Sequence, residues 1–326
     1  MSATGPVSVA ELGPTLMHEH IYVNLMREFR GTGLLNDEQE AEAELIAFAK
    51  LGGGTILDLT PVELSVGAAP DPGDWRSLDR SIPDLTPLSR SAGNVKALRD
   101  LSTRTGVRII LGTGHYRDPY LAGTAVETAD PAQVADHMVR DIEEGFSGTE
   151  VRAGIIGEVG AERWFISALE ERSLRAAAMA HRRTSLPIST HAARWPNGLL
   201  QLELLGELGV PPEAVIIGHC DSVNIPEYHL ELARRGAYVQ FDTFRMSAGP
   251  HFERRVGFIQ NLIRQGFGEQ ILLSHDVCET THLRSNGGGG FTVILTALQQ
   301  RMEALGLQSV YEDLIVHNPR RALGGE

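Results

Sequence analysis

The residues best suited to chemistry in this sequence stand at the ends of short apolar runs. His18 and His20 follow the first run and are two positions apart, and residues two apart on a β-strand point to the same face. Both imidazoles can therefore hold one metal ion, and imidazole with carboxylate is an ordinary ligand set for Zn²⁺, Mn²⁺ or Co²⁺. Further ligand-type residues end four later runs: Glu158, His191, His219 and Asp276. A lone histidine in a strand usually belongs to the core, but so many buried polar groups would be costly without a partner, which favours a metal centre.

Eight apolar runs alternate with eight amphipathic stretches along the chain. The runs are Thr15–Met17, Gly54–Leu59, Arg108–Leu111, Ala153–Ile156, Pro187–Ser189, Ala214–Ile217, Ala237–Phe241 and Gln270–Leu273. The stretches are Asp37–Leu51, Gly93–Thr105, Pro131–Gly145, Trp164–Arg183, Gly198–Leu208, Ile225–Arg235, His251–Gln265 and Gly290–Leu305. The alternation predicts an α/β fold, a parallel (β/α)₈ TIM barrel, and eight units in succession favour closure over an open doubly wound sheet. The C-terminal strand ends of such a barrel meet at one mouth, where the six candidate ligands would converge.

Composition and charge narrow the class of protein. The chain has 326 residues, 42% of them hydrophobic, which suits one barrel domain spanning residues 1–326. The formal net charge of −13 argues against nucleic acid or an anionic membrane as partner and leaves a small-molecule substrate. We see no secretion signal or membrane-length apolar run, and therefore expect a cytoplasmic protein. Cys220 and Cys278 stand in apolar surroundings and are expected to be buried free thiols. The segment Gly67–Arg90 is expected to be a long βα loop.

The motifs, in their order along the chain, resemble the phosphotriesterase-like branch of the amidohydrolase superfamily. The resemblance covers essentially the whole chain. The matching segments are residues 11–20 (ELGPTLMHEH), 112–116 (GTGHY), 156–160 (IGEVG), 189–192 (STHA), 217–221 (IGHCD), 273–278 (LSHDVC), 281–284 (THLR) and 318–321 (NPRR).

This resemblance implies a binuclear metal centre holding two divalent ions per chain, zinc first, with manganese, cobalt or iron as alternatives. His18, His20 and Asp276 would hold the more buried ion, His191 and His219 the more exposed one. Glu158 would bridge the two.

The bridge departs from the best-known phosphotriesterases, in which a carboxylated lysine fills this role. The sequence has only Lys50 and Lys96, and neither stands at a strand end. A glutamate at the bridge resembles the family branch that contains phosphotriesterase homology proteins and several lactonases. We therefore do not expect classical organophosphate hydrolysis to be the main activity.

The expected mechanism follows from metal chemistry. Two adjacent ions lower the pKa of a bridging water, so that hydroxide can attack a carbonyl or phosphoryl group near neutral pH. Asp276 is the candidate catalytic residue, a proton shuttle that accepts the proton and returns it to the leaving oxygen. Asp221 either orients a ligand or caps the next helix. His275 precedes Asp276, so we expect it to point away from the barrel interior and to be structural.

Four residues are candidate substrate contacts. Tyr116 is similar to a pocket tyrosine of lactonase relatives, although it could equally be a packing aromatic. Arg117, Arg245 and Arg284 follow predicted strands, and guanidinium groups at a barrel mouth suit phosphate or carboxylate. A surface ion pair is the alternative for each arginine.

The function favoured by these observations is hydrolysis of a lactone or small carboxylic ester. Phosphoester or amide hydrolysis on the same site is the alternative, because fold and metal alone do not choose the substrate. A binding protein without turnover is a third hypothesis, against which the complete ligand set argues. Relatives are commonly dimers, so a homodimer is an open expectation.

Overall fold

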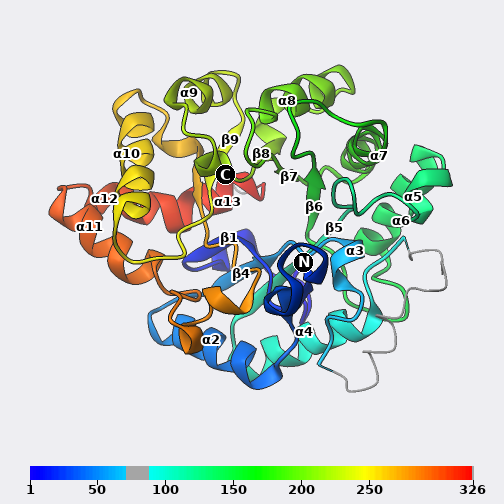
Figure 1. The fold of residues 1–326 in the computed structure, drawn as a ribbon, viewed down its shortest axis with the longest axis horizontal. Coiled ribbons are helices and arrows are strands. Elements are labelled where there is room, and N and C mark those ends of the chain that lie inside the picture. Colours follow the sequence, from blue (N-terminus) through cyan, green and yellow to red (C-terminus); the bar gives the residue numbers. More distant parts are fainter. Residues whose placement is uncertain (71–87, 325–326) are drawn as a thin grey trace.

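A computed structural model describes residues 1–70 and 88–324 of the chain. Eight parallel strands form a nearly closed barrel with helices around it (Figure 1). The strands are β1 (Thr15–Glu19), β4 (Thr55–Asp58), β5 (Arg108–Thr113), β6 (Ile155–Gly160), β7 (Ile188–His191), β8 (Val215–Ile217), β9 (Tyr238–Phe241) and β10 (Ile271–Leu273). They neighbour one another in chain order. The predicted TIM barrel is therefore confirmed, and each strand overlaps one predicted run.

The first and last strands meet through the residues that carry the candidate site. The backbone N–H of Asp276 donates to the carbonyl of His18 at 3.2 Å. In the other direction, the N–H of His18 donates to Ser274 Oγ at 2.9 Å. Closure of the barrel thus brings the two ends of the chain's ligand set together.

Helices follow the strands where the sequence predicts them. They are α2 (Glu38–Lys50), α4 (Ala92–Thr105), α6 (Pro131–Glu143), α7 (Ala168–Thr184), α8 (Gly198–Glu207), α9 (Pro226–Arg234), α10 (Pro250–Arg264) and α11 (Gln299–Ala304). Side-chain caps mark the first residues of α2, α6 and α7. Ser167 caps α7 by accepting from the N–H of Glu170, whose side chain accepts from Ser167 in return. This capping box begins α7 at Ala168, four residues after the predicted start at Trp164.

The last predicted helix is the one that differs. Gly290 has a φ of +51°, a left-handed conformation that cannot continue a right-handed helix. The helical segment instead includes a π-helical turn at Ile294–Leu298, followed by α11. Two short helices then end the described chain, α12 (Gln308–Glu312) and α13 (Asn318–Ala322).

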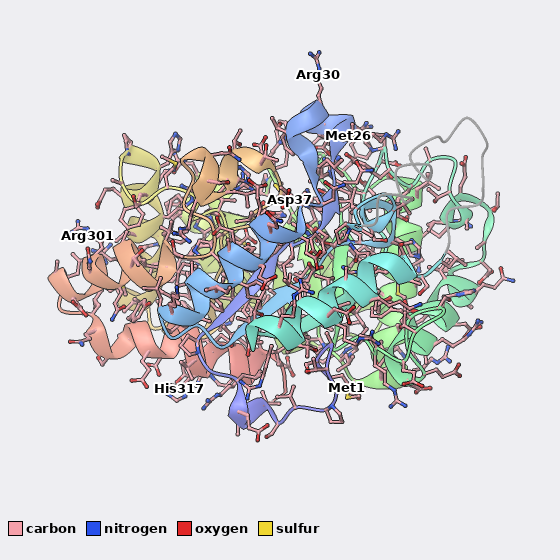
Figure 2. All side chains as sticks on the ribbon, turned by 90° about the horizontal axis from the view of Figure 1, so that it is seen from below. Met1, Met26, Arg30, Asp37, Arg301 and His317 are labelled. Atoms are coloured by element: carbon pink, nitrogen blue, oxygen red, sulfur yellow. The ribbon has the colours of Figure 1, made fainter. Side chains whose placement is uncertain are left out.

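A small excursion after β1 was not predicted. Strands β2 (Val23–Asn24) and β3 (Leu34–Leu35) pair antiparallel, and helix α1 (Met26–Phe29) and a 3₁₀ turn at Arg30–Gly33 lie between them. Figure 2 shows this excursion protruding from the body of the protein at Met26 and Arg30. Its elements are two to four residues long, too short for a periodic pattern that would predict them.

Two apolar clusters form the core. The larger one fills the space between the barrel and its helices. The smaller one joins residues from seven of the eight strands, among them Met17, Leu57, Ile110, Ile216 and Leu272. Side chains from so many strands can meet only inside the barrel, so this cluster fills the barrel interior below the mouth.

Two further predictions concern the long loop after the second strand and the absence of membrane-spanning segments. Most of the predicted loop Gly67–Arg90 lies outside the described residues. In the described part, no helix combines the length and apolar character needed to cross a membrane.

Candidate metal centre and its cavity

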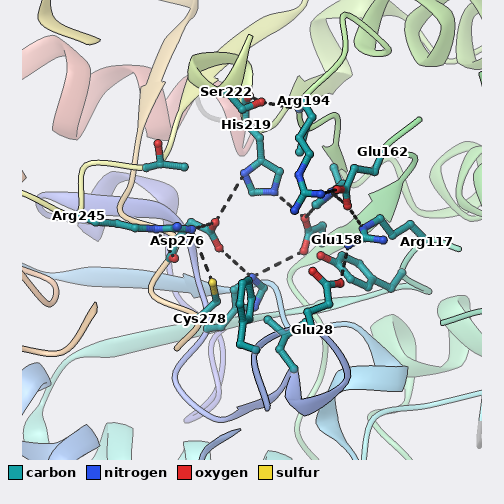
Figure 3. A pocket seen from close by; sticks show the side chains of 17 residues that line it. Glu28, Arg117, Glu158, Glu162, Arg194, His219, Ser222, Arg245, Asp276 and Cys278 are labelled. Atoms are coloured by element: carbon teal, nitrogen blue, oxygen red, sulfur yellow. Dashed lines mark hydrogen bonds and ion pairs between the residues drawn. The ribbon is translucent and has the colours of Figure 1, made fainter. Parts of the chain in front are cut away.

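The C-terminal strand ends surround a cavity of about 170 Å³. Its wall comes from the segments that follow or end seven of the strands, all except β4. Five of the six predicted metal ligands line this cavity, and the sixth, His18, lies fully buried. Figure 3 shows Glu158, His219 and Asp276 facing one another across it.

The structure brings the six predicted ligands together in two groups. His18, His20 and Asp276 form one group, in which the ligand atoms lie within 4.8 Å of one another. Glu158, His191 and His219 form the other by the same measure, and a third group, His18, His219 and Asp242, overlaps both. The first group is the one that the family resemblance implied, and the second adds Glu158, the implied bridge, to the implied pair His191 and His219.

Glu158 lies between the two groups. Its Oε1 is 2.7 Å from His191 Nδ1 and 3.0 Å from His219 Nε2. On the other side, Oε1 is 3.6 Å from His18 Nε2 and Oε2 is 3.7 Å from His20 Nε2. One buried carboxylate is therefore placed to face a cation in each group.

Two of the ligands stand on backbone that is unusual for residues other than glycine. His219 has a φ of +54° and Asp276 a φ of +51°. Each follows the end of its strand, where the left-handed turn redirects the chain across the mouth. Left-handed backbone costs about 1–2 kcal/mol per residue, and such outliers gather at functional sites.

The electrostatics of the cluster call for positive charge. Burial opposes protonation of His18, but the carboxylates of Glu158 and Asp242 outweigh it and raise the pKa of His18 to about 10. Burial likewise opposes ionisation of Glu158, yet His18 and His191 hold its pKa well below the ordinary value. For Asp276, Arg245 and nearby histidines outweigh burial and lower the pKa. A divalent cation between these imidazoles and carboxylates would supply that positive charge.

Unused ligand atoms test whether the cluster fits metal. Both ring nitrogens of His18 and Nε2 of His191 are buried and make no hydrogen bond of good geometry within the described residues, although carboxylate oxygens lie 3.3–3.6 Å away. Buried polar atoms without a partner are rare in proteins, and neutral imidazole nitrogens beside carboxylates are the donors that zinc and its neighbours prefer. The residues present therefore fit divalent metal ions.

Asp242 is a functional residue that the sequence reasoning missed. It is fully buried and accepts from the backbone N–H of His219 at 2.9 Å and from its Nδ1 at 2.8 Å. This fixes the imidazole with Nε2 toward Glu158, the usual arrangement around a ligating histidine. The signal was available, because Asp242 directly follows the seventh predicted run. Thr60 stands in a similar position 3.1 Å from Nδ1 of His20.

Two more buried carboxylates support the loops rather than an ion. Asp221 accepts from the backbone N–H groups of Asp242 and Thr243 at 3.3 and 3.1 Å. It does not cap α9, where Ile225 holds the capping position, and it acts on His219 only through Asp242. His275 points away from the metal cluster as expected, because its Nδ1 lies 2.9 Å from Glu19 Oε1 and its Nε2 accepts from the N–H of Ile294.

Three of the four predicted substrate contacts line the cavity. Tyr116 is nearly buried and its ring lies 5.1 Å from that of His191. Arg245 forms an ion pair with Asp276, and its Nε donates to the Asp276 carbonyl at 3.1 Å. Arg117 pairs with both Glu28 and Glu162 and donates to the Asp118 carbonyl. Arg117 therefore fits the alternative of an ion pair, because each of its three nitrogens faces an oxygen of the protein.

Arg284 is not brought to the cavity, which corrects its prediction as a substrate contact. Its backbone N–H donates to Glu44 at 2.7 Å, and it lines a separate surface hollow with Gln39 and Glu40 of α2. The chain after β10 has already left the mouth of the barrel where it reaches Arg284. Arg284 therefore lies outside the site, although it follows a strand that contributes to it.

The cavity also has members that sequence reasoning did not single out. Glu28 comes from the excursion after β1, Glu162 follows β6 and Arg194 follows β7. Glu162 Oε1 lies 2.8 Å from Arg194 Nη1, and Oε2 lies 3.4 Å from His191 Nε2. Both cysteines are free and buried, and Cys278 lines the cavity.

The chain is similar to known proteins over most of its length. The sequence pattern of the phosphotriesterase family matches residues 80–323. A phosphotriesterase homology protein from Escherichia coli is 36% identical over 227 residues, which are 69% of this chain and 77% of that protein. An N-acetyltaurine hydrolase from Dictyostelium discoideum is 30% identical and matches over 98% of this chain and 96% of its own length. The crystal structure of a lactonase from Listeria monocytogenes has a TM-score of 0.84 at 25% identity, covering all of this chain and 98% of that one.

A (β/α)₈ barrel with a histidine and carboxylate cluster at its C-terminal mouth defines a metal-dependent hydrolase. Within that class, this chain belongs to the phosphotriesterase family. It is a hydrolase, and the family resemblance seen in the motifs is confirmed.

Proposed function

We propose that the protein binds two divalent metal ions, most readily zinc, and hydrolyses a lactone or a small carboxylic ester. The observation that carries the proposal is the position of Glu158, whose carboxylate lies within 3.7 Å of an imidazole from each group of ligands. A glutamate there replaces the lysine bridge of classical phosphotriesterases. The structural likeness to a lactonase supports the lactone as first substrate class.

The bound ions would supply an activated water and would polarise the oxygen of the scissile group. Asp276 accepts the proton released in the attack and returns it to the leaving oxygen. Its low pKa keeps it ionised and ready to accept at neutral pH. Tyr116 is nearly buried beside His191. Burial and the charge of Glu158 raise its pKa well above the ordinary value, so its hydroxyl stays protonated and donates a hydrogen bond to the substrate oxygen.

Arg245 has two roles in this proposal. Its Nε and Nη2 donate to the backbone and carboxylate of Asp276, so it holds the proton acceptor in place. Its exposed remainder, with the side chain 27% accessible, faces the cavity and contacts the substrate.

Amide hydrolysis is the second candidate, and one observation favours it. The relatives that match nearly the full length of this chain include N-acetyltaurine hydrolases, which are named for cleaving an amide. An amide carbonyl would be polarised by the same centre, and Asp276 would then protonate a leaving nitrogen instead of an oxygen.

The experiment that tests the proposal is a hydrolysis screen of the metal-loaded protein with a pH indicator. The panel contains γ- and δ-lactones, sugar lactones, aryl esters, N-acetylated amino acids, N-acetyltaurine and a phosphotriester. Turnover of a lactone or ester series that a chelator abolishes and added metal restores is the expected result. Turnover of the N-acetyl compounds alone would replace the first candidate by the second, and turnover of the phosphotriester alone would contradict both.

A further inference from the structure

The cavity contains three arginines, and only some of their donors are already used. Arg117 is 7% exposed and faces Glu28, Glu162 and the Asp118 carbonyl with its three nitrogens. Each of its three nitrogens thus already faces a protein oxygen, and it supports the wall. The other two, Arg194 and Arg245, lie on different sides of the cavity, one beside Glu162 and one beside Asp276 (Figure 3).

Arg194 is the cation with a complete free edge. Its Nη1 lies 2.8 Å from Glu162 Oε1, while Nε and Nη2 have no partner among the described residues. These two N–H groups form the side edge of a guanidinium, which matches two oxygens of one oxyanion. Arg245 differs, because its Nε and Nη2 already hold Asp276 and the His275 carbonyl.

The backbone of Arg194 is held in a conformation that aims this side chain. Arg194 has a φ of +67°, and besides it only four described residues other than glycine have positive φ: Arg30, Ser185, His219 and Asp276. Its N–H donates to Ser222 Oγ at 2.8 Å, and that hydroxyl donates to the carbonyl of His219 at 2.6 Å. The turn that presents Arg194 is thus tied directly to a ligand-bearing loop, and unusual backbone of this kind is typical of functional positions.

Charge around the cavity favours an anion there. Four carboxylates (Glu28, Glu158, Glu162 and Asp276) and three guanidinium groups (Arg117, Arg194 and Arg245) line the cavity, which leaves the wall with one net negative charge. The two divalent ions of the proposed function would make the sum positive, and Arg194 and Arg245 offset the carboxylates beside them. An anionic group would find an attractive field here although the chain as a whole has a formal net charge of −13, because local charge dominates inside a cleft.

We propose that Arg194 is a specificity-determining residue that binds an oxyanion group, a carboxylate, sulfonate or phosphate, on the part of the substrate remote from the scissile bond. This inference rests on the proposed function, since it places the scissile group at the metal centre. The substrate is then a small lactone, ester or amide with an acidic tail. With its side chain 68% exposed, Arg194 can turn from Glu162 toward such a tail while Arg117 keeps Glu162 in place.

A binding measurement tests this without turnover. Isothermal titration of the metal-loaded protein compares butanoate with glutarate, 4-sulfobutanoate and 4-phosphonobutanoate. The shared carboxylate of each probe occupies the metal centre, and the second group reports on Arg194. At least one dianion is expected to bind about 10- to 100-fold more tightly than butanoate, the range for a charge-assisted hydrogen bond, and the three dianions show which oxyanion is preferred.

Three variants assign that gain. Arg194→Gln should lose it and leave butanoate binding unchanged, and Arg194→Lys should keep part of it. Arg163→Gln, an exposed arginine nearby that does not line the cavity, should behave as the parent protein. The inference is overturned if no dianion exceeds butanoate, or if Arg194→Gln retains the full gain. Either result would leave hydrolysis of uncharged lactones in the screen unaffected, so the two proposals fail separately.

Discussion

Replacing Asp242 by asparagine removes a negative charge next to the centre and leaves all six predicted ligands in place. The carboxylate accepts two hydrogen bonds from His219, from the backbone N–H at 2.9 Å and from Nδ1 at 2.8 Å. It also lies 3.3 Å from Nδ1 of His18. An amide keeps one acceptor oxygen and turns the other toward these donors as an NH₂ group. One contact in the pair must therefore be lost or inverted.

The expected loss can be estimated from that contact. A hydrogen bond to a charged group contributes about 1.5–3 kcal/mol, and 1.4 kcal/mol corresponds to a tenfold change in affinity. We expect Asp242→Asn to weaken binding of at least one metal ion by about 10- to 150-fold. The ion held by His219 should be the more affected, because that imidazole loses its fixed orientation.

The assay is a competitive titration of the metal-free protein with zinc and a chromophoric chelator, which gives a Kd for each ion. Asp100→Asn is the matched control, an exposed aspartate paired only with the neighbouring Arg99. Circular dichroism of both variants shows whether the barrel has formed. Dissociation constants within twofold of the parent protein, in a folded Asp242→Asn variant, would refute the reasoning.

Other substitutions separate the remaining roles. Asp276→Asn should lower kcat by about 100-fold or more in a folded protein, and near-normal turnover would remove it from proton transfer. Glu158→Gln should reduce the metal content per chain in elemental analysis, and two retained ions would show that another group bridges them. Tyr116→Phe should lower kcat/KM by up to about tenfold, as for one lost neutral hydrogen bond, whereas an unchanged value would make it a packing residue. Burial raises the pKa of Asp141 from 3.8 to about 6, so the stability it contributes is complete below pH 3.8 and lost as the pH rises through 6. Asp141→Asn should therefore leave the free energy of unfolding nearly unchanged at pH 3.5 and raise it by up to about 3 kcal/mol at pH 7.5; urea titrations at both pH values that show equal effects would contradict this.

Much of the barrel could be predicted because its signals are local. Strands buried on both faces produce unbroken apolar runs, and the ligand-type residues stand where those runs end. The same apolar runs therefore predicted both the strands and the candidate ligands. The rule also applied to Asp242, which ends the seventh run after Phe241. The ligand pattern of the family places no ligand at Asp242, and only its distance to His219 shows what it does.

The loops could not be predicted in the same way. Arg194 stands three residues after β7 and Arg284 eleven residues after β10, and only Arg194 of the two lines the cavity. The path of each loop depends on long-range contacts, such as the hydrogen bond from Arg194 to Ser222, that no periodic pattern records. Glu28 could not be predicted as a cavity residue for the same reason, because it lies in the excursion of short elements after β1.

The two predicted ligands with left-handed backbone, His219 and Asp276, are held in place in the same way. His219 follows β8, and Asp242, which directly follows the neighbouring strand β9, accepts its backbone N–H. Asp276 follows β10, and Glu19, which ends the neighbouring strand β1, accepts the N–H groups of His275 and Val277 on either side of it, at 2.8 and 2.9 Å.

In each case a fully buried carboxylate from the next strand around the barrel holds a left-handed turn. Charged hydrogen bonds of about 1.5–3 kcal/mol outweigh a backbone cost of about 1–2 kcal/mol. For Asp276 the next strand is the first of the chain, so the proposed proton acceptor is positioned only when β10 meets β1. Closure of the barrel is therefore a condition for the site, and a change that separates these two strands should abolish activity before it unfolds the rest.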